Sequence, residues 1–211
     1  MIINKNYNNP YTYEPKSFNE LREIIEQRYK EQGPGTEKNP IDLNDIDISN
    51  IYCFWDKNIE KSIFEEIEFE YIDVSDWDVS GVKDISYMFD GCEKLKSAGN
   101  LSKWDVSSVE DMQGMFYECE NLKSVGNLSK WDVSSVRDIS YMFYGCNNLK
   151  SVGNLSKWKI VSVEDAVETF SGCEKLKSVG DLSKWDVSNA KNMERMFVDS
   201  GITNIPDWYE E

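Results

Sequence analysis

Apolar and polar positions in this chain return with a fixed period of 27 residues. The segment from Trp104 to Lys130 reads WDVSSVEDMQGMFYECENLKSVGNLSK, and the next copy begins WDVSSVRDISYMFYGCNNLK at Trp131. The tryptophans keep the same spacing at Trp77, Trp104, Trp131, Trp158 and Trp185. A period of about 20–50 residues is the signature of stacked repeats, so it predicts an α/β repeat solenoid.

Other apolar positions form columns in the same register. The three clearest columns are Val79, Val106, Val133, Ile160 and Val187; Phe89, Phe116, Phe143, Phe170 and Phe197; and Leu95, Leu122, Leu149 and Leu176. One copy cannot bury enough of this surface to offset the entropy of ordering its backbone. The copies are therefore expected to stack, and the ends of the stack need caps.

Within a copy, the pattern changes from a strand-like to a helix-like spacing. Leu122-Lys-Ser-Val125 alternates apolar and polar residues, which predicts a short half-buried strand, and Gly126-Asn127 predicts a turn. Asp111 precedes Met112-Gln-Gly-Met-Phe116, whose spacing predicts a helical turn with an aspartate N-cap. We expect one short parallel strand, turns and one short helix in each 27-residue coil.

The two ends depart from the repeat. Ser17-Phe-Asn-Glu20 fits a capping box, and the apolar spacing that follows predicts a helix over about 18–31 that caps the first coil or binds a partner. A degenerate copy, IDISNI, begins at Ile46, whereas Ile202, Ile205 and Trp208 continue the columns weakly. The expected domains are an N-terminal arm with a capping helix over 1–45 and a solenoid over 46–211 (degenerate coil 46–76, repeats from 77, 104, 131, 158 and 185).

The repeat resembles the BspA-like leucine-rich repeats of bacterial proteins, whose signature is W-D-V-S-N-V-x-D-M-x-x-M-F-x-x-C-x-x-L. It stands almost complete as WDVSGVKDISYMFDGCEKL from Trp77 and WDVSSVRDISYMFYGCNNL from Trp131, and the resemblance covers about residues 72–200. The fourth copy departs at Lys159 and Ala166, and the last copy lacks the cysteine. The resemblance implies a leucine-rich-repeat-like solenoid in a surface or interaction protein without enzymatic activity.

Charge and residue usage narrow the function. The chain holds 39 acidic and 23 basic residues, a net charge of −16. This charge argues against nucleic acids and anionic membranes as ligands, because binding to either needs clustered Lys and Arg. It would instead steer a basic protein towards the chain. The chain has no histidine, which removes Ser-His-Asp triads and the commonest general acid–base residue.

We therefore expect no enzyme, no cofactor and no metal. The residues that follow Met1 contain no apolar run of signal-peptide length, so we expect a cytoplasmic protein, or a cell-surface protein if an export signal has been removed. Outside its complex the protein is expected to be a monomer.

Cysteine recurs beside the phenylalanine column, at Cys92, Cys119, Cys146 and Cys173. Three interpretations compete: small buried residues, disulfides between coils, and a metal or redox ladder. We favour reduced buried thiols, because free cysteine is among the most buried residue types and the chain has no Cys-x-x-Cys.

Three further columns consist of polar residues, and each could serve either a structural or a chemical role. They are Asp78, Asp105, Asp132 and Asp186; Asp84, Asp111, Asp138 and Asp165; and Asn100, Asn127, Asn154 and Asp181. We interpret them as residues that bond to nearby backbone in turns and N-caps, with calcium, paired carboxylates and glycosylation sequons as the alternatives. The tryptophans are expected to be a packed stripe, with an exposed sugar-binding stack as the alternative.

Departures from the repeat indicate where a partner binds. The stretch Ile46–Asp76 exceeds the period by four residues and has nine acidic against two basic residues. The acidic charge would steer a basic partner, and the aromatic residues of this stretch would anchor it. The alternative is that these aromatic residues only close the first coil against the helix. The candidate partner-binding residues are Phe54, Trp55, Glu65, Glu66, Glu68, Phe69 and Tyr71 in this stretch, and Tyr87, Tyr117, Tyr141 and Tyr144 on the predicted helical face.

The sequence thus predicts a non-catalytic protein-binding repeat module. Its acidic aromatic insert suggests an immunity or inhibitor protein that neutralises a basic toxin, such as a nuclease, by resembling its anionic substrate. The alternative is a bacterial surface adhesion protein, which the family resemblance favours.

Overall fold

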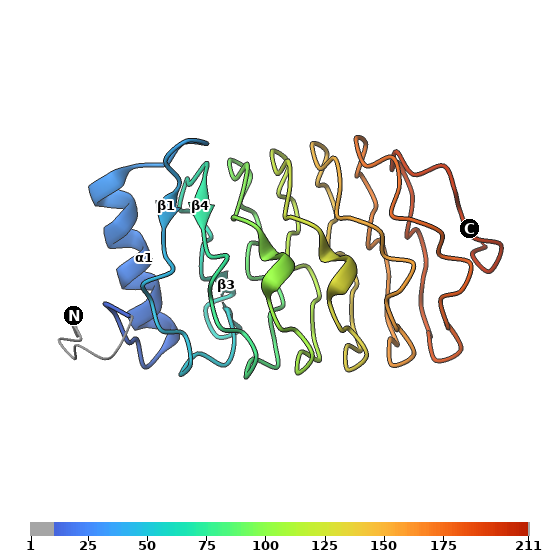
Figure 1. The fold of residues 1–211 in the computed structure, drawn as a ribbon, viewed down its shortest axis with the longest axis horizontal. Coiled ribbons are helices and arrows are strands. Elements are labelled where there is room, and N and C mark those ends of the chain that lie inside the picture. The colour runs from blue at the N-terminus through green and yellow to red at the C-terminus, as the bar shows by residue number, and fades with distance from the viewer. Residues whose placement is uncertain (1–10, 211) are drawn as a thin grey trace.

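The computed structural model describes residues 11–210, in which successive copies of the repeat lie side by side along one axis (Figure 1). We call the copies that begin at Trp77, Trp104, Trp131, Trp158 and Trp185 coils 1 to 5. The regular elements are α1 (Phe18–Gln32), β1 (Ile41–Asp42), β2 (Trp55–Asp56), β3 (Lys61–Ser62), β4 (Ile72–Asp73) and the 3-10 turns η1 (Leu101–Lys103) and η2 (Leu128–Lys130). β1 pairs in parallel with β4, whereas β2 and β3 form an antiparallel hairpin.

Backbone hydrogen bonds join each coil to the next. Between coils 1 and 2, the N–H groups of every second residue donate to carbonyls 26 residues further on, as from Ile85 to Asp111 (3.0 Å) and from Phe89 to Met115 (2.9 Å). The same row recurs at the later junctions, and parallel bridges such as Asp111–Asp138 lie beside it. The backbone polar groups are therefore satisfied between coils, which holds equivalent positions side by side.

This row of bonds explains why the helical turn predicted at Met112–Phe116 is wrong. These residues form turns, and Asp111 lies at a parallel bridge instead of an N-cap, where its side chain accepts from the Gln113 N–H (2.8 Å). Gly114 and Glu118 have left-handed φ angles of 57° and 54°, so the chain cannot continue as a right-handed helix.

The strand predicted at Leu122–Val125 is reduced to one bridged residue. Ser124 pairs in parallel with Ser97 of the preceding coil, and no regular strand forms around it. Over residues 11–210 the only α-helix is α1, so the assignment to a leucine-rich-repeat-like class stays a prediction.

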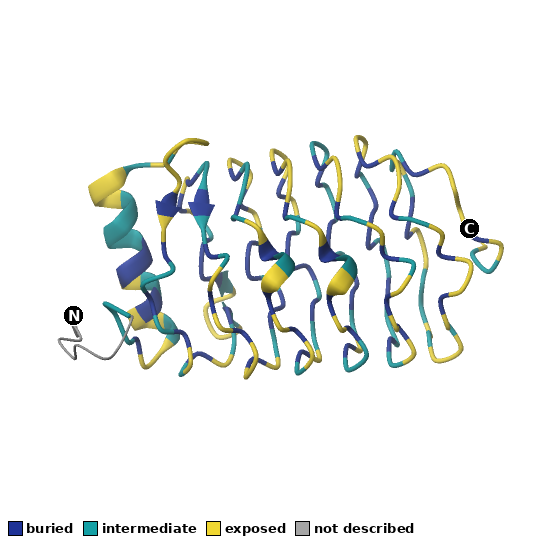
Figure 2. Cartoon of the chain, viewed as in Figure 1, coloured by how far each residue is buried: buried dark blue, intermediate teal, exposed yellow. Residues whose placement is uncertain are grey.

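The interior is a stack of like side chains, which Figure 2 shows as a dark buried lining of each coil. Phe116 and Phe143 stack with ring centroids 5.5 Å apart, and the other phenylalanines of the column continue the stack. Trp131 stacks on Trp104 at 6.5 Å, and its Nε1–H donates to the Leu101 carbonyl (2.9 Å). The tryptophans are buried, which confirms the predicted packed stripe.

The polar columns serve the turns. Asp105 accepts from the Ser107 N–H (3.1 Å) and Asn127 from the Ser129 N–H (3.0 Å), and equivalent residues repeat these bonds. This confirms the predicted turn role of both columns. The repeat cysteines are buried and unpaired, and the Cys146 thiol donates to the Phe116 carbonyl (3.2 Å), as expected of small core residues.

The helix α1 forms where the sequence predicts a helix, and it lies at the start of the stack against β1 and the degenerate coil over 46–76 (Figure 1). Ser17 accepts from the Glu20 N–H (3.2 Å) as the predicted N-cap, and the helix buries Leu21, Ile24 and Ile25. At the other end, Trp208 stacks on Trp185 with ring centroids 6.3 Å apart. Apolar residues therefore cover both ends of the stack.

The stacked core generates a stability prediction. Phe143→Ala removes a fully buried ring that contacts a ring on each side, so we expect a loss of about 3–5 kcal/mol in the free energy of unfolding. Urea denaturation measures it, with Val161→Ala, a 42% exposed residue, as the control that changes stability by less than about 0.5 kcal/mol. Equal losses in the two variants would contradict the stacked core.

Candidate partner-binding surface

The predicted site residues of the Ile46–Asp76 stretch separate into core and surface residues. Phe54 and Phe69 are 0% and 3% exposed. Phe54 stacks on Trp77 at 5.9 Å, and Phe69 meets Tyr29 of α1 edge-on at 5.2 Å. Phe69 closes the degenerate coil over 46–76 against the helix, and Phe54 packs that coil on coil 1. A partner cannot contact these two buried rings, so their prediction as contact residues is corrected.

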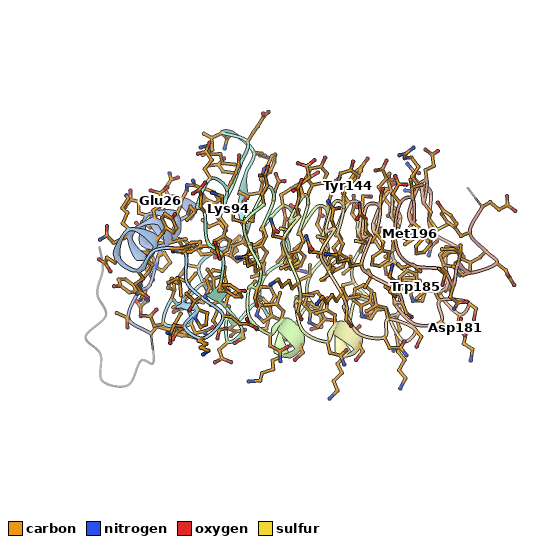
Figure 3. The ribbon with its side chains drawn as sticks, turned by 90° about the horizontal axis from the view of Figure 1, so that it is seen from above. Glu26, Lys94, Tyr144, Asp181, Trp185 and Met196 are labelled. Atoms are coloured by element: carbon orange, nitrogen blue, oxygen red, sulfur yellow. The ribbon has the colours of Figure 1, made fainter. Side chains whose placement is uncertain are left out.

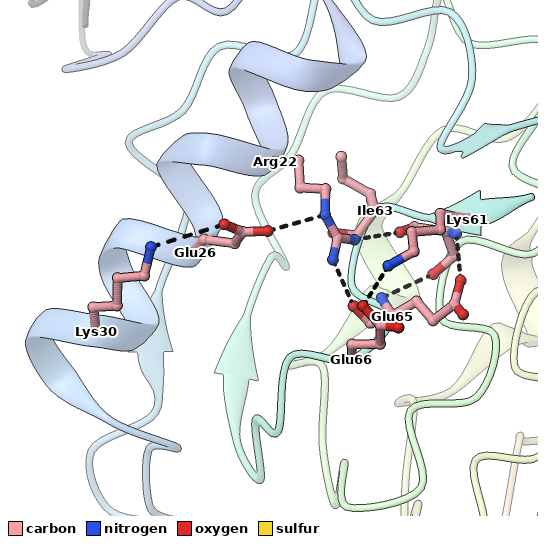
Figure 4. A network of polar contacts seen from close by, with 8 residues as sticks. Arg22, Glu26, Lys30, Lys61, Ile63, Glu65 and Glu66 are labelled. Atoms are coloured by element: carbon pink, nitrogen blue, oxygen red, sulfur yellow. Dashed lines mark hydrogen bonds and ion pairs between the residues drawn. The ribbon is translucent and has the colours of Figure 1, made fainter. Parts of the chain in front are cut away.

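The hairpin β2–β3 is held by an arginine of the helix (Figure 4). The Arg22 guanidinium donates to the backbone carbonyls of Ser62 (2.7 Å) and Glu65 (2.8 Å). The Glu65 carboxylate turns back and accepts from the Ser62 N–H (3.0 Å). This network anchors the hairpin and so places half-buried Trp55 at the edge of coil 1.

The other predicted acidic residues of the stretch already have cations beside them. Glu66 pairs with Lys61, and Glu68 pairs with Lys94 at 2.5 Å. Tyr71 is half-buried beneath the Lys96 ammonium, which lies 5.6 Å from the ring centroid. These residues lie at the surface, but much of their charge is balanced within the chain.

The four predicted tyrosines and Trp55 form two neighbouring groups of rings. Tyr117 stacks on Tyr144 with ring centroids 4.9 Å apart, and Tyr141 meets both rings edge-on at 6.1 Å. Trp55 lies 5.5 Å from Tyr87, whose ring covers Gly114, where a Cβ atom would overlap it. The structure therefore joins the insert and three coils in one half-exposed aromatic surface.

The backbone contributes to these two groups of rings. Tyr87 and Tyr141 occupy the left-handed region, with φ of 52° and 59°, at the position where coil 2 has Gly114. The equivalent Glu168 and Arg195 share this conformation, with φ of 51° and 56°, so it is a property of the repeat that costs any residue other than glycine some strain. Two coils thus place a tyrosine where glycine would fit most easily.

Carboxylates without a cation border the rings. Asp90 and Glu118 form no ion pair within residues 11–210. Burial raises the pKa of Asp90 to about 6, and the nearby Glu65 and Glu118 add to the increase. Burial, followed by Glu118 and Tyr144, raises the pKa of Tyr117 to about 12, so this phenol stays neutral. We call Trp55, Tyr87, Asp90, Tyr117, Glu118, Tyr141 and Tyr144 the aromatic–acid surface.

Sequence reasoning missed two members of this surface. Asp90 occupies the same repeat position as Tyr117 and Tyr144, and this difference between coils was the available signal. Glu118 takes a position that is glycine at Gly91 and Gly145. That departure from glycine at a left-handed residue was the available signal.

The surface combines aromatic rings with carboxylates, and Glu118 lies close enough to the Tyr117 hydroxyl to contribute to its raised pKa. Within the described residues, no group of three or more acidic, cysteine or histidine side chains could hold a metal ion. None of the described helices is long and apolar enough to cross a bilayer.

Comparison with known proteins yields one match. The sequence model of a family described as "Mycoplasma protein of unknown function, DUF285" matches residues 57–179 and 121–208. No curated protein and no solved structure matches the chain. The matched family differs from the BspA-like repeats, so that resemblance stays a prediction.

The shifted pKa of Asp90 generates a prediction about stability and pH. Folding raises the pKa from 3.8 to about 6, so the folded state binds more protons in this window and loses stability as pH rises through it. Asp90→Asn should therefore unfold at a higher temperature than the wild type at pH 8, with little difference at pH 3.5.

Asp186→Asn is the matched control with the opposite sign. Hydrogen bonds from Ser188 lower the pKa of Asp186, so its charge stabilises the folded state above the ordinary pKa, and the amide should lower the unfolding temperature at pH 8. Thermal unfolding by circular dichroism measures both variants. A lower unfolding temperature for Asp90→Asn at pH 8 would contradict the assigned environment.

Proposed function

We propose that this chain, which belongs to the DUF285 family, is a non-catalytic module that binds a basic protein partner through its aromatic–acid surface. One observation carries the proposal. Within residues 11–210, Asp90 and Glu118 form no ion pair and lie beside half-exposed rings, whereas Glu110 and Glu168 pair with basic residues of the neighbouring coil. Other unpaired carboxylates, such as Asp105, lie in turns. A cationic partner would supply the missing charge.

The rings are already ordered before a partner arrives. Tyr117 and Tyr144 stack on each other, Tyr141 closes against them, and Tyr87 rests on Gly114. Tyrosine presents a large contact area with few rotatable bonds, so fixing it costs little entropy, and aromatic residues dominate interface hot spots. Packing between coils therefore supports an anchor region for a partner.

The carboxylates of the aromatic–acid surface favour a basic side chain of the partner at the centre of this surface. A Lys or Arg of the partner could lie over a ring while it approaches Asp90 or Glu118, which combines a cation–π contact with a charge-assisted hydrogen bond. The chain's net charge of −16 would raise the association rate of such a partner.

An immunity or inhibitor protein that neutralises a basic toxin is one specific case of this function. Neighbouring carboxylates such as Asp90 and Glu118 support it, because rows of anionic groups resemble the phosphates that a nuclease binds. A surface adhesion protein is the alternative, and the resemblance to BspA-like repeats is the observation that favours it. In that case the partner is an extracellular protein.

The test is capture of a partner that depends on the named surface. Immobilised wild-type protein is compared with Tyr117→Ala/Tyr144→Ala and with the control Val161→Ala, each incubated with host lysate and, separately, with culture supernatant. We expect a basic protein bound to the wild type and the control, with affinity for the double variant lowered about 30-fold or more, since even a single hot-spot truncation costs about 2 kcal/mol.

The outcomes separate the alternatives. A basic partner from the lysate favours the inhibitor role, and one from the supernatant favours adhesion. If the double variant binds every captured protein as tightly as the wild type, the aromatic–acid surface is not the binding site. Thermal unfolding of the double variant checks that it is folded.

A further inference from the structure

A second surface lies on the other side of the coils. Figure 3 shows Tyr144 and Asp181 at opposite edges of the stack, and the 3-10 turns η1 and η2 lie on the Asp181 side. This side is built by the segment that reads LKSVGNLSK in coils 2 and 3. We call its lysines the lysine face: Lys96, Lys103, Lys123, Lys130, Lys150, Lys157, Lys177 and Lys184.

The register makes these lysines two parallel columns. Backbone bonds join them directly, as from the Lys123 N–H to the Lys96 carbonyl (3.1 Å) and from the Lys150 N–H to the Lys123 carbonyl (3.3 Å). Adjacent strands lie about 4.8 Å apart, so positive charges repeat at about this spacing along the stack. The segments 96–103, 123–130 and 150–157 contain no acidic residue, and Asp181 is the exception in coil 4.

Most of these lysines have no anionic partner. Lys96 pairs with Glu70 and Lys103 with Asp76 at 3.7 Å. The other lysines of the face are exposed and form no ion pair within residues 11–210. Elsewhere in coils 1 to 5, cations such as Lys83 and Arg195 pair with glutamates of an adjacent coil. Unpaired positive charge is therefore concentrated on this face.

The residues between the lysines also present donors. The Asn127 carbonyl oxygen accepts from the Ser129 N–H (3.0 Å), and the Ser124 hydroxyl oxygen accepts from the Gly126 N–H (3.2 Å). Their amide and hydroxyl hydrogens remain for a ligand, because no bond within the described chain uses them. The same arrangement recurs at Asn154 and Ser151. Coils 1 to 3 thus each offer ammonium, hydroxyl and amide donors together.

We propose that the lysine face binds a linear anionic polysaccharide that runs along the stack. Evenly spaced donors suit a chain with regularly repeated sulfate or carboxylate groups and many hydroxyl oxygens. The face has no aromatic residue and no arginine in its four segments, so it lacks the stacking platform that single-stranded nucleic acids use. The described residues of this face form no α-helix that could enter the groove of a duplex.

The net charge of −16 does not prevent this binding. Charges further than about 8–10 Å away are largely screened at physiological salt, and the aromatic–acid surface lies on the opposite side. A ligand at the lysine face would meet the lysine columns, and the exposed Asp105, Asp132 and Asp186 border the face two residues beyond Lys103, Lys130 and Lys184. This proposal uses a different surface from the proposed protein partner and does not depend on it.

The probes are heparin for sulfate, polygalacturonate for carboxylate and polyuridylate for nucleic acid. Fluorescence titration of the full chain at about 50 and 200 mM salt should detect binding of at least one polysaccharide, weaker at the higher salt because counterions are released. Lys123→Gln/Lys150→Gln should weaken this binding at least tenfold. The control Lys38→Gln/Lys57→Gln removes the same charge from two exposed lysines outside the face and should change affinity less than twofold.

Three results would overturn the proposal. One is the absence of binding to both polysaccharides at about 50 mM salt, and another is an equal loss in the two double variants. The third is tighter binding of polyuridylate that Lys123→Gln/Lys150→Gln abolishes, which would assign the face to nucleic acid. Unfolding temperatures within about 2 °C of the wild type show that the variants are folded.

Discussion

A row of backbone hydrogen bonds from each coil to the next sets the register on which the rest of the structure depends. Because the Ile85 N–H meets the Asp111 carbonyl and the later junctions repeat this geometry, each side chain lies beside its own equivalent. Phenylalanine then stacks on phenylalanine in the core. Outside the core, like charges about 5 Å apart repel by only about 0.8 kcal/mol in water, so surface columns tolerate repetition and can differ freely in chemistry.

This freedom separates two surfaces on one scaffold. On one side, Tyr117, Tyr141 and Tyr144 pack beside carboxylates that form no ion pair within residues 11–210. On the lysine face, lysines such as Lys123 and Lys150 repeat without an ion pair to any described residue. A protein of net charge −16 can therefore present a basic face, and a single chain could join a basic protein to an anionic polymer.

Much of the core could be predicted from the 27-residue period, because burial columns and turn residues recur in sequence. The conformation after Asp111 could not be predicted, since the apolar spacing of a helical turn is also compatible with a turn whose backbone bonds to another coil. Phe54 lies in the core and its neighbour Trp55 lies half-buried at the surface. This difference follows from the hairpin β2–β3 and could not be seen in the sequence. The lysine face could not be predicted from the net charge, because that value sums the charges of all sides of the molecule.

Disulfide trapping tests the register most directly. Ser97 and Ser124 are paired across coils 1 and 2, so Ser97→Cys/Ser124→Cys places two cysteines within the roughly 4.4–6.8 Å Cα separation of a disulfide. Mild oxidation should close this bond rapidly in the native protein, and Ser97→Cys/Ser151→Cys, two coils apart, should stay reduced. Mass spectrometry of the digested protein distinguishes the pairs. Cross-linking of the second pair in preference to the first would contradict the register and, with it, the assignment of both surfaces.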